Sequence, residues 1–214
     1  LYDGSYEEFR DALFAVGELP IPKWIRTKPE EIDNDRFHTI YAKNEGAVAT
    51  PAAGLHFSRE LFKRMEIRDV NATFLTLHMG LGHFRKVDVE DLSKHKMDSE
   101  QMTITEETAN LINSTKAAGH KVFAVGITVI RALETPVTTK AEVKPYVGWT
   151  NKFIFPPYQF SVADARVTNF HMPLSTMLMS VAAFGGFENV MNAYKVALKE
   201  GYQFGTYGDA MLVI

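Results

Sequence analysis

The chain has 214 residues, 46% of them hydrophobic and 23% charged, which is ordinary for one large globular domain or two small ones. Its net charge of −3 gives no overall positive field for a nucleic acid, and the lack of cysteine excludes disulfides, thiolate nucleophiles and cysteine-bound zinc. No apolar run approaches the ~20 residues of a membrane span and no signal peptide opens the chain, so we expect no membrane partner.

The first 22 residues predict a helix and an extended connection. Ser5 and Glu8 have the spacing of a capping box, apolar residues follow with a helical period, and Gly17 marks the end of the helix. Pro20 and Pro22 come next and require an extended backbone, and a charged linker follows them. We therefore place the domain boundary in this connection, with residues 1–22 on one side and the main domain, residues 23–214, on the other.

Helices and strands alternate through the rest of the chain. In the first half we expect a loop of small residues over Gly46–Phe57, a helix from Ser58 to about Arg68, strands over Ala72–His78 and Met102–Thr105, a helix over Glu106–Ala118 and a buried strand over Lys121–Gly126. In the second half we expect a mobile loop over Pro136–Gly148, strands over Phe153–Phe155 and up to Val167, helices over Thr176–Phe184 and Phe187–Glu200, and a buried strand over Tyr207–Ile214. This alternation predicts a layered α/β domain with a mixed, largely parallel sheet, in which Lys121–Gly126 and Ala210–Ile214 are interior strands.

The glycine pair Gly80 and Gly82 follows a predicted strand, as in a dinucleotide-binding fingerprint. The residues after the pair, Phe84–Val89, have an extended pattern, so no helix presents its N-terminus to a phosphate. We interpret the pair as a tight loop that faces a ligand and reject a Rossmann fold.

Polar residues gather where the strand ending at Val167 meets the next helix. Thr168, Asn169 and His171 form a polar loop, and Ser175 stands at the N-cap of an apolar helix. Open α/β sheets bind ligands at the carboxyl ends of their strands, so this loop is a candidate site. The alternative is that these side chains only cap the helix and satisfy its backbone.

Two charged residues at other strand ends are further candidates. Arg131 opens a helix after a strand, where a guanidinium suits a carboxylate or phosphate; the alternative is a salt bridge to Glu134 or another acid. Asp209 stands at the head of a buried strand and is either a general base or the partner that orients a histidine. His78 and His83 flank the glycine loop, but no ligand set completes a metal site around them.

Six segments in order resemble one known family. They are GAVATPAAGLHF, TFLTLHMGLGHF, HKMDSE, FAVGITVIRALE, VTNFHMPLSTMLMSVAAFGG and NAYKVALKEGYQFGTYGDAM. From about Gly17 onward the chain resembles the S-adenosylmethionine:tRNA ribosyltransferase-isomerases of the queuosine pathway. The match begins partway along the family's pattern, so the resemblance implies that the N-terminal part is missing, including much of an inserted β-barrel domain. It makes residues 1–22 the tail of that barrel or a linker.

The resemblance implies a cytoplasmic enzyme that modifies tRNA. The ribosyl group of S-adenosylmethionine, the co-substrate, moves to the aminomethyl group of a 7-deazaguanine at the wobble position of a tRNA anticodon stem-loop. The product is epoxyqueuosine, and adenine and methionine are released. The reaction implies a base near the sulfonium-activated C5′, a donor that helps adenine depart and no metal.

Several motifs depart from the family's usual pattern. His83 stands where threonine is usual, and Asp98 replaces the second histidine of H-x-M-H-S-E. Where the family usually has GTTSVR, this chain has GITVIR, and where the family has FFSYGDAM, this chain has FGTYGDAM. Arg166 stands where the family has an apolar residue.

Chemistry and position together predict one cleft at the converging strand ends. We expect His171 or Asp209 to be the base, His56 to be the acid at adenine, and Arg131 to hold the methionine carboxylate or an RNA phosphate. The remaining substrate-binding candidates are Gly54, Gly80, Gly82, Phe84, Glu100, Thr128, Thr168, Asn169, Ser175 and Thr176.

A second function stays open on the sequence alone. A divergent relative could bind RNA or an adenosyl ligand without turnover. In either case RNA phosphates would meet lysines, for which the candidates are Lys86, Lys94, Lys96, Lys140, Lys144 and Lys152. Their affinity would fall steeply with salt.

Overall fold

The computed structural model describes residues 3–21 and 30–214, and the chain divides into two compact units, residues 1–38 and 39–214. The first unit contains the helices α1 (Tyr6–Val16) and α2 (Asp33–Arg36). The predicted capping box is present at the start of α1, and Gly17 ends the helix. The predicted charged linker lies partly outside the described residues. The described part of this unit contains no β-strand, so no barrel remnant is seen there.

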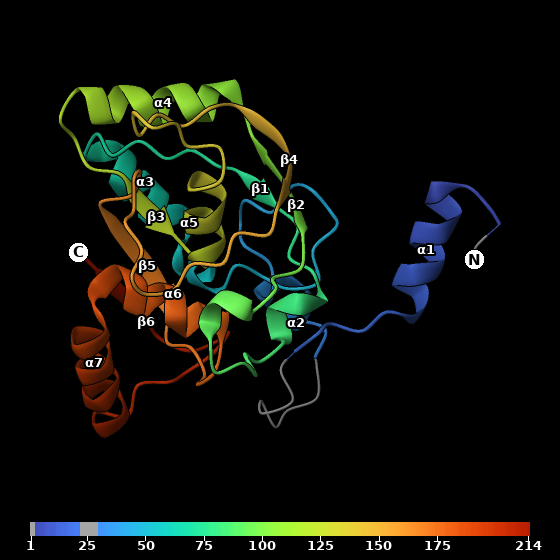
Figure 1. The fold of residues 1–214 in the computed structure, drawn as a ribbon. Coiled ribbons are helices and arrows are strands. Elements are labelled where there is room, and N and C mark those ends of the chain that lie inside the picture. The colour runs from blue at the N-terminus through green and yellow to red at the C-terminus, as the bar shows by residue number, and fades with distance from the viewer. Residues whose placement is uncertain (1–2, 22–29) are drawn as a thin grey trace. The chain divides into compact units, whose positions relative to one another are not determined.

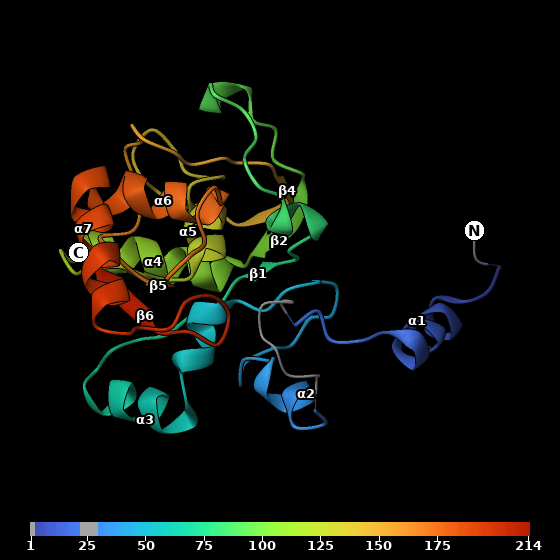
Figure 2. The ribbon, with the colours of Figure 1, turned by 90° about the horizontal axis from the view of Figure 1, so that it is seen from below.

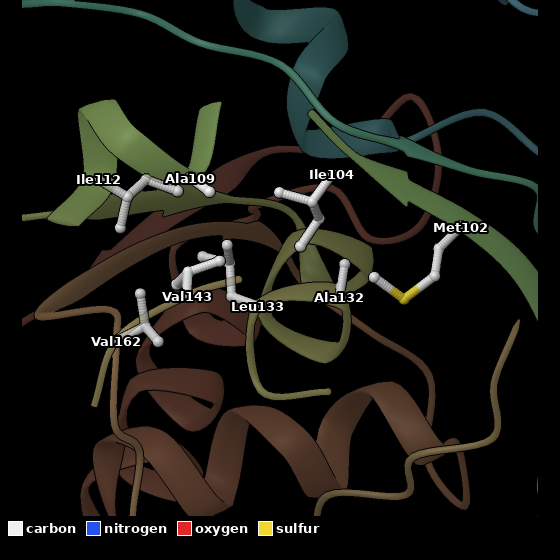
Figure 3. Packing of buried hydrophobic residues seen from close by; sticks show 8 residues of the cluster. All are labelled: Met102, Ile104, Ala109, Ile112, Ala132, Leu133, Val143 and Val162. Atoms are coloured by element: carbon white, nitrogen blue, oxygen red, sulfur yellow. The ribbon is translucent and has the colours of Figure 1, made fainter. Parts of the chain in front are cut away.

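The second unit contains two small sheets (Figure 1). The first sheet has the order β1 (Thr76–Leu77), β2 (Glu100–Ile104) and β4 (Tyr146–Thr150), and both of its pairings are antiparallel. The helix α4 (Glu106–Ala117) follows β2. A hydrophobic core joins this sheet to α4 and to the helix α5 (Ile127–Leu133), as Figure 3 shows. Its buried members are Met102, Ile104, Ala109, Ile112, Ala132, Leu133, Val143 and Val162.

The second sheet positions the polar segment around His171, and Thr168 and Asn169, which the sequence placed in a loop, lie in its middle strand. Its order is β3 (Phe123–Val125), β5 (Ala165–Asn169) and β6 (Ala210–Val213). The strands β3 and β5 are parallel, and β5 and β6 are antiparallel. The helices α6 (Thr176–Gly185) and α7 (Phe187–Lys199) pack over one side through a cluster that includes Phe170, Val181 and Tyr194. Figure 2 shows α6 on one side of β5 and β6, with α3 (Arg59–Ile67) on the other.

Short 3₁₀ helices complete the unit. They are η1 (Ala52–His56), η2 (Leu81–Phe84) and η3 (Leu92–Lys94). The first of them packs against β5 and lies within the loop of small residues that the sequence predicts.

The predicted α/β class with a mixed sheet is confirmed, but the prediction of a single, largely parallel sheet is wrong. One sheet is wholly antiparallel, and only β3 and β5 run parallel in the other. The prediction that Lys121–Gly126 and Ala210–Ile214 are interior strands is also wrong, because β3 and β6 are the two edges of their sheet. These segments are apolar because helices cover one face; Met211 and Val213, for example, pack against the cluster under α6 and α7.

Two local strand predictions fail. The strand predicted over Ala72–His78 shortens to β1, and Phe153–Phe155 forms no strand. The loop predicted over Pro136–Gly148 is irregular up to Pro145, apart from an isolated bridge between Val137 and Val143, and only its last three residues lie in β4. Aromatic side chains in these segments pack against each other, as Phe153 does against Phe155. A run of apolar residues that pack in this way has the same sequence pattern as a strand, so periodicity alone does not distinguish the two.

Candidate functional site

Alternation along β5 sends its polar side chains to opposite faces of the sheet. On one face, Arg166 bonds to Ser180 of α6. On the other face, Asn169 bonds to His56 at the end of η1. The predicted strand ends do converge, because Val125 pairs with Val167 and Asn169 pairs with Ala210. The polar side chains at this edge are therefore divided between two faces of one short sheet.

His171 is held on the α6 face by two hydrogen bonds. Its Nε2 lies 2.8 Å from the hydroxyl of Thr168, and its backbone N–H donates to the Tyr194 hydroxyl at 2.9 Å. The side chain is half-buried. Burial, followed by the nearby charges of Arg166 and His83, lowers the pKa of His171 to about 3. The imidazole is therefore neutral at pH 7, the form that accepts a proton.

The free energy of unfolding is expected to fall as the pH is lowered from 6.5 towards 3. The unfolded chain protonates His171 near its ordinary pKa of 6.5, whereas the folded protein does so only near 3. Between these values the unfolded state binds more protons, so acid favours unfolding; above pH 6.5 the contribution of His171 is complete. Denaturant titrations at about pH 7 and about pH 4.5 should show a larger loss for the parent than for His171→Gln. Equal losses would contradict this assignment.

Asn169 organises the loop before β6 from the opposite face. Its Nδ2 donates to the carbonyl of Gly205 at 2.9 Å and to that of Gly208 at 3.1 Å, and it is 1% exposed. Its Oδ1 lies 3.2 Å from Nε2 of His56. Asn169 therefore ties η1, β5 and the loop before β6 together, and it places His56, which is exposed, at this junction.

Asp209 closes the same loop. Its Oδ2 accepts the backbone N–H of Gln203 at 2.7 Å, and its own N–H donates to the Gln203 carbonyl at 2.9 Å. Its carbonyl accepts the N–H of Phe170 at 3.3 Å. One carboxylate oxygen of Asp209 thus has a structural partner in the turn that precedes β6.

A buried ion pair joins β2 to α5. The Nη1 of Arg131 donates a hydrogen bond to the Glu100 carboxylate. Its Nε donates to the Lys152 carbonyl at 2.9 Å. The other Glu100 oxygen accepts the backbone N–H of Gly80 at 2.9 Å. The Glu100 side chain is 4% exposed and the Arg131 side chain is 6% exposed. The acid that Arg131 meets is therefore Glu100, and Glu134 instead accepts hydrogen bonds from Tyr158 and from the backbone of Ser161 and Val162.

His83 is the titratable side chain of the glycine loop. It lies on η2, and burial lowers its pKa while the charge of Glu100 opposes that shift and the charge of Arg131 adds to it. Its charge also acts on His171. The segment after η2 runs beside the polar loop, since Val87 N–H donates to the Leu174 carbonyl at 2.8 Å. The sequence singled out His83 as a histidine at a strand end and weighed it as a metal ligand, but gave it no substrate-binding role.

The glycines of the two small-residue loops differ in what surrounds them. A Cβ on Gly54 would collide with the Tyr41 hydroxyl, and one on Gly82 would collide with the Asp98 carboxylate. A Cβ on Gly80 would meet nothing within 4 Å. Gly54 is thus required by the packing of Tyr41 and Thr39, whereas the Asp98 carboxylate beside Gly82 is exposed and can move, and Gly80 borders open space beside Glu100.

Alanine substitutions should separate these two roles. Gly54→Ala is expected to lower the free energy of unfolding by ~1–3 kcal/mol, because the half-buried Tyr41 ring and the buried Thr39 must shift. Gly80→Ala should change it by less than ~0.5 kcal/mol, since its backbone is extended and the space is open. If the S-adenosylmethionine that the family resemblance implies approaches Gly80, this variant will bind it more weakly in calorimetry. A variant that binds like the parent would remove Gly80 from the site.

The remaining candidates have mainly local partners. Ser175 caps α6 as predicted, accepting the N–H of Leu178 at 3.1 Å and donating to the Met172 carbonyl at 2.7 Å. Thr176 and Thr128 lie in the first turns of α6 and α5. Phe84 is half-exposed and meets the His83 ring edge-on. Among the described residues, no group of three or more histidine or acidic side chains could hold a metal ion, and no helix is long and apolar enough to span a membrane.

Comparisons with known proteins agree on one family. Residues 3–213 match the family model described as "Queuosine biosynthesis protein". Proteins named S-adenosylmethionine:tRNA ribosyltransferase-isomerase from Bacteroides fragilis and Parabacteroides distasonis are 62% and 61% identical over the whole chain. The chain spans 61% of the length of each of these proteins. A crystal structure of S-adenosylmethionine tRNA ribosyltransferase from Thermotoga maritima is similar, with a TM-score of 0.64 and 40% identity over 76% of this chain and 51% of that one.

Proposed function

Since the chain belongs to the queuosine biosynthesis protein family, we propose that it carries out the reaction for which its relatives are named. The ribosyl group of S-adenosylmethionine passes to the aminomethyl group of a 7-deazaguanine at the tRNA wobble position. The group is isomerised to give epoxyqueuosine, and adenine and methionine leave. The observation that carries the proposal is the family match along the whole chain, which includes the polar loop around His171.

His171 is the base in this proposal. The reaction removes a proton from C5′, which the neighbouring sulfonium makes acidic, and a neutral imidazole can accept it. Its Nε2 is held by Thr168, and this bond orients the ring. Asp209 is the second choice, because one of its carboxylate oxygens already accepts the N–H of Gln203.

Two other residues take supporting roles. His56 is the candidate acid that protonates departing adenine. It is exposed, Asn169 holds one of its ring nitrogens, and it lies on the opposite face of β5 from His171, so this role requires the substrate to reach around the end of the strand. Arg131 is the proposed partner of the methionine carboxylate or an RNA phosphate. Its Nη2 lacks a hydrogen-bond partner among the described residues but is buried, so such a contact requires the groups that cover it to move. Glu100 holds the opposite side of that guanidinium and so sets its direction.

The RNA partner is proposed to be the anticodon stem-loop. Five of the six candidate lysines are exposed: Lys86, Lys94, Lys96, Lys140 and Lys144. Of these, Lys94 also forms an ion pair with Asp91 at 3.7 Å. Lys152 is half-buried, with its ammonium 3.5 Å from the Tyr158 hydroxyl. Exposed lysines are free to follow a phosphate backbone, so Lys86, Lys96, Lys140 and Lys144 are the stronger candidates. We further propose that residues 1–22 belong to a region separate from the main domain.

Release of free adenine tests the proposal directly. The full-length protein would be incubated with S-adenosylmethionine and a stem-loop that carries 7-aminomethyl-7-deazaguanine, with a guanine stem-loop as control. Adenine is expected only with the modified base, and affinity for RNA should fall with salt at a slope of ~0.7 per single-stranded phosphate contact. Tight, salt-dependent binding of RNA without adenine would instead identify a binding protein that lacks turnover.

A further inference from the structure

The two faces of the first sheet differ in character. Met102, Ile104 and Tyr146 point into the hydrophobic core that α4 and α5 share (Figure 3). Side chains alternate along a strand, so the residues between them point away from that core. On β4, an edge strand, these are Val147 and Trp149, which are 76% and 62% exposed. A large aromatic side chain thus stands in solvent, and the packing of the described residues does not explain it.

Trp149 belongs to a row of side chains that crosses the sheet. Its antiparallel partner on β2 is Gln101, and the Gln101 carbonyl accepts the N–H of His78 at 2.9 Å, directly after β1. Residues opposite one another in an antiparallel pair point to the same face, with Cβ atoms ~4.5–5.5 Å apart. Gln101 is exposed, and His78 is half-buried against Gly46. The row therefore presents an indole, an amide and an imidazole side by side.

The end of the sheet that contains this row is basic. Lys152 follows β4 by two residues, and the exposed Lys96 precedes β2 by four. The acidic side chains at this end are paired with arginines, in the pairs Glu100–Arg131 and Asp98–Arg85. At the other end, where β2 leads into α4, the exposed Glu106 and Glu107 stand instead. The charges therefore suit a polyanion at the Trp149 end.

We propose that this row is an RNA-binding surface, on which an unpaired base of the stem-loop stacks against the Trp149 indole. An aromatic ring accepts any base in this way, because every base has a π-face. The amide of Gln101 can both donate to and accept from the edge of the stacked base. The flanking Lys96 and Lys152 meet the phosphates on either side of it. The proposal rests on the proposed function in that the partner is RNA.

The surface adjoins the candidate site through two connections. His78 is two residues before Gly80, a chain length of at most ~7 Å, and the N–H of Gly80 bonds to Glu100. At the end of β4, the carbonyl of Lys152 accepts the Nε of Arg131 at 2.9 Å. A loop nucleotide held on Trp149 therefore places its neighbours beside the glycine loop.

A second copy of this chain explains the face less well. The centre of an interface between copies is mostly apolar. Here the two apolar residues of β4 stand opposite polar ones, Trp149 opposite Gln101 and Val147 opposite Thr103. Single-stranded RNA needs one ring for stacking and polar groups around it for the base edges, and this face offers that combination.

Binding of a fluorescently labelled anticodon stem-loop with an ordinary guanine measures the contribution of Trp149 without turnover. By fluorescence anisotropy of the full-length protein, Trp149→Ala is expected to weaken binding roughly 5- to 100-fold, the usual effect of losing one stacked base. Trp149→Phe keeps a ring and should stay within about threefold of the parent. Phe123→Ala should bind like the parent; Phe123 is the matched control because it is 53% exposed on β3, an edge strand of the other sheet.

Melting curves check that each variant folds, and the outcomes separate stacking from other roles. Parent-like binding by Trp149→Ala would overturn the proposal, as would equal losses in the alanine and phenylalanine variants or a parent that binds no RNA. A parent dimer that Trp149→Ala separates, with unchanged RNA affinity, would identify the face as a contact between copies.

Adenine release judges the enzyme separately from this surface. If the parent releases adenine and Trp149→Ala binds RNA like the parent, only the surface is wrong. If RNA binding depends on Trp149 and the parent releases no adenine, the surface stands and the proposed reaction falls.

Discussion

Replacing His171 with glutamine is expected to lower the rate of adenine release by ~10²–10⁴-fold, the usual cost of losing a general base. Glutamine keeps a polar group near Thr168 but cannot take the substrate proton. The backbone N–H of residue 171 still reaches the Tyr194 hydroxyl, so the fold should survive. Single-turnover assays of adenine, with circular dichroism to check folding, measure both effects.

His120→Gln is a matched control, because His120 is exposed in the turn between α4 and β3. It should release adenine at the parent rate. If His171→Gln does the same, His171 only ties its loop to Thr168 and the base lies elsewhere. Asp209 would then be tested by Asp209→Asn, which keeps an oxygen to accept the Gln203 N–H, alongside Asp209→Ala, which removes it. Loss of turnover in both variants, with the fold intact in Asp209→Asn, would assign the base to Asp209.

Replacing Glu100 with glutamine is expected to lower the free energy of unfolding by ~3–5 kcal/mol. Glutamine has nearly the same shape and can still accept the Gly80 N–H, so the change removes charge more than volume. It leaves the guanidinium of Arg131 buried without a counter-ion, which is the costly state. Urea unfolding at constant pH measures the difference, provided that the slope of the unfolding curve is unchanged.

The exposed pair of Glu60 and Arg64 on α3 is the matched comparison. Both side chains are more than 70% exposed, so Glu60→Gln should cost less than ~1 kcal/mol. The double variant Glu100→Gln with Arg131→Met should recover part of the lost stability, since the uncompensated charge is then removed as well. Equal losses in Glu100→Gln and Glu60→Gln would show that the buried pair contributes no more than a surface pair.

The sequence alone determined where most helices begin. Ser5, Ser58, Thr105 and Ser175 each cap the helix that was predicted to follow, and each accepts a backbone N–H three residues ahead. Such signals are local, because the cap and the donor lie in the same turn of chain. The polar loop after β5 was predicted for the same reason, since a strand, a cap and an apolar helix follow one another within a few residues.

Strand pairing was beyond the reach of the sequence. Apolar runs such as Lys121–Gly126 indicate that a segment is covered, but the same run suits an interior strand and an edge strand beneath helices. The order β3, β5, β6 and the separation into two sheets depend on which distant segments pack together. Local patterns contain no information about the partner of a strand, and the predicted single sheet failed at that point.

The candidate site divides in the same way. The sequence by itself identified His171, Asn169 and Arg131 as residues at strand ends, because strand ends and polar loops can be read locally. Only the tertiary structure paired Arg131 with Glu100, which is 31 residues away, and set Arg166 against Ser180, 14 residues away across a helix packed on a strand. Packing decided these two interactions, because a charged side chain can be buried only where the fold places hydrogen-bonding or charged groups next to it.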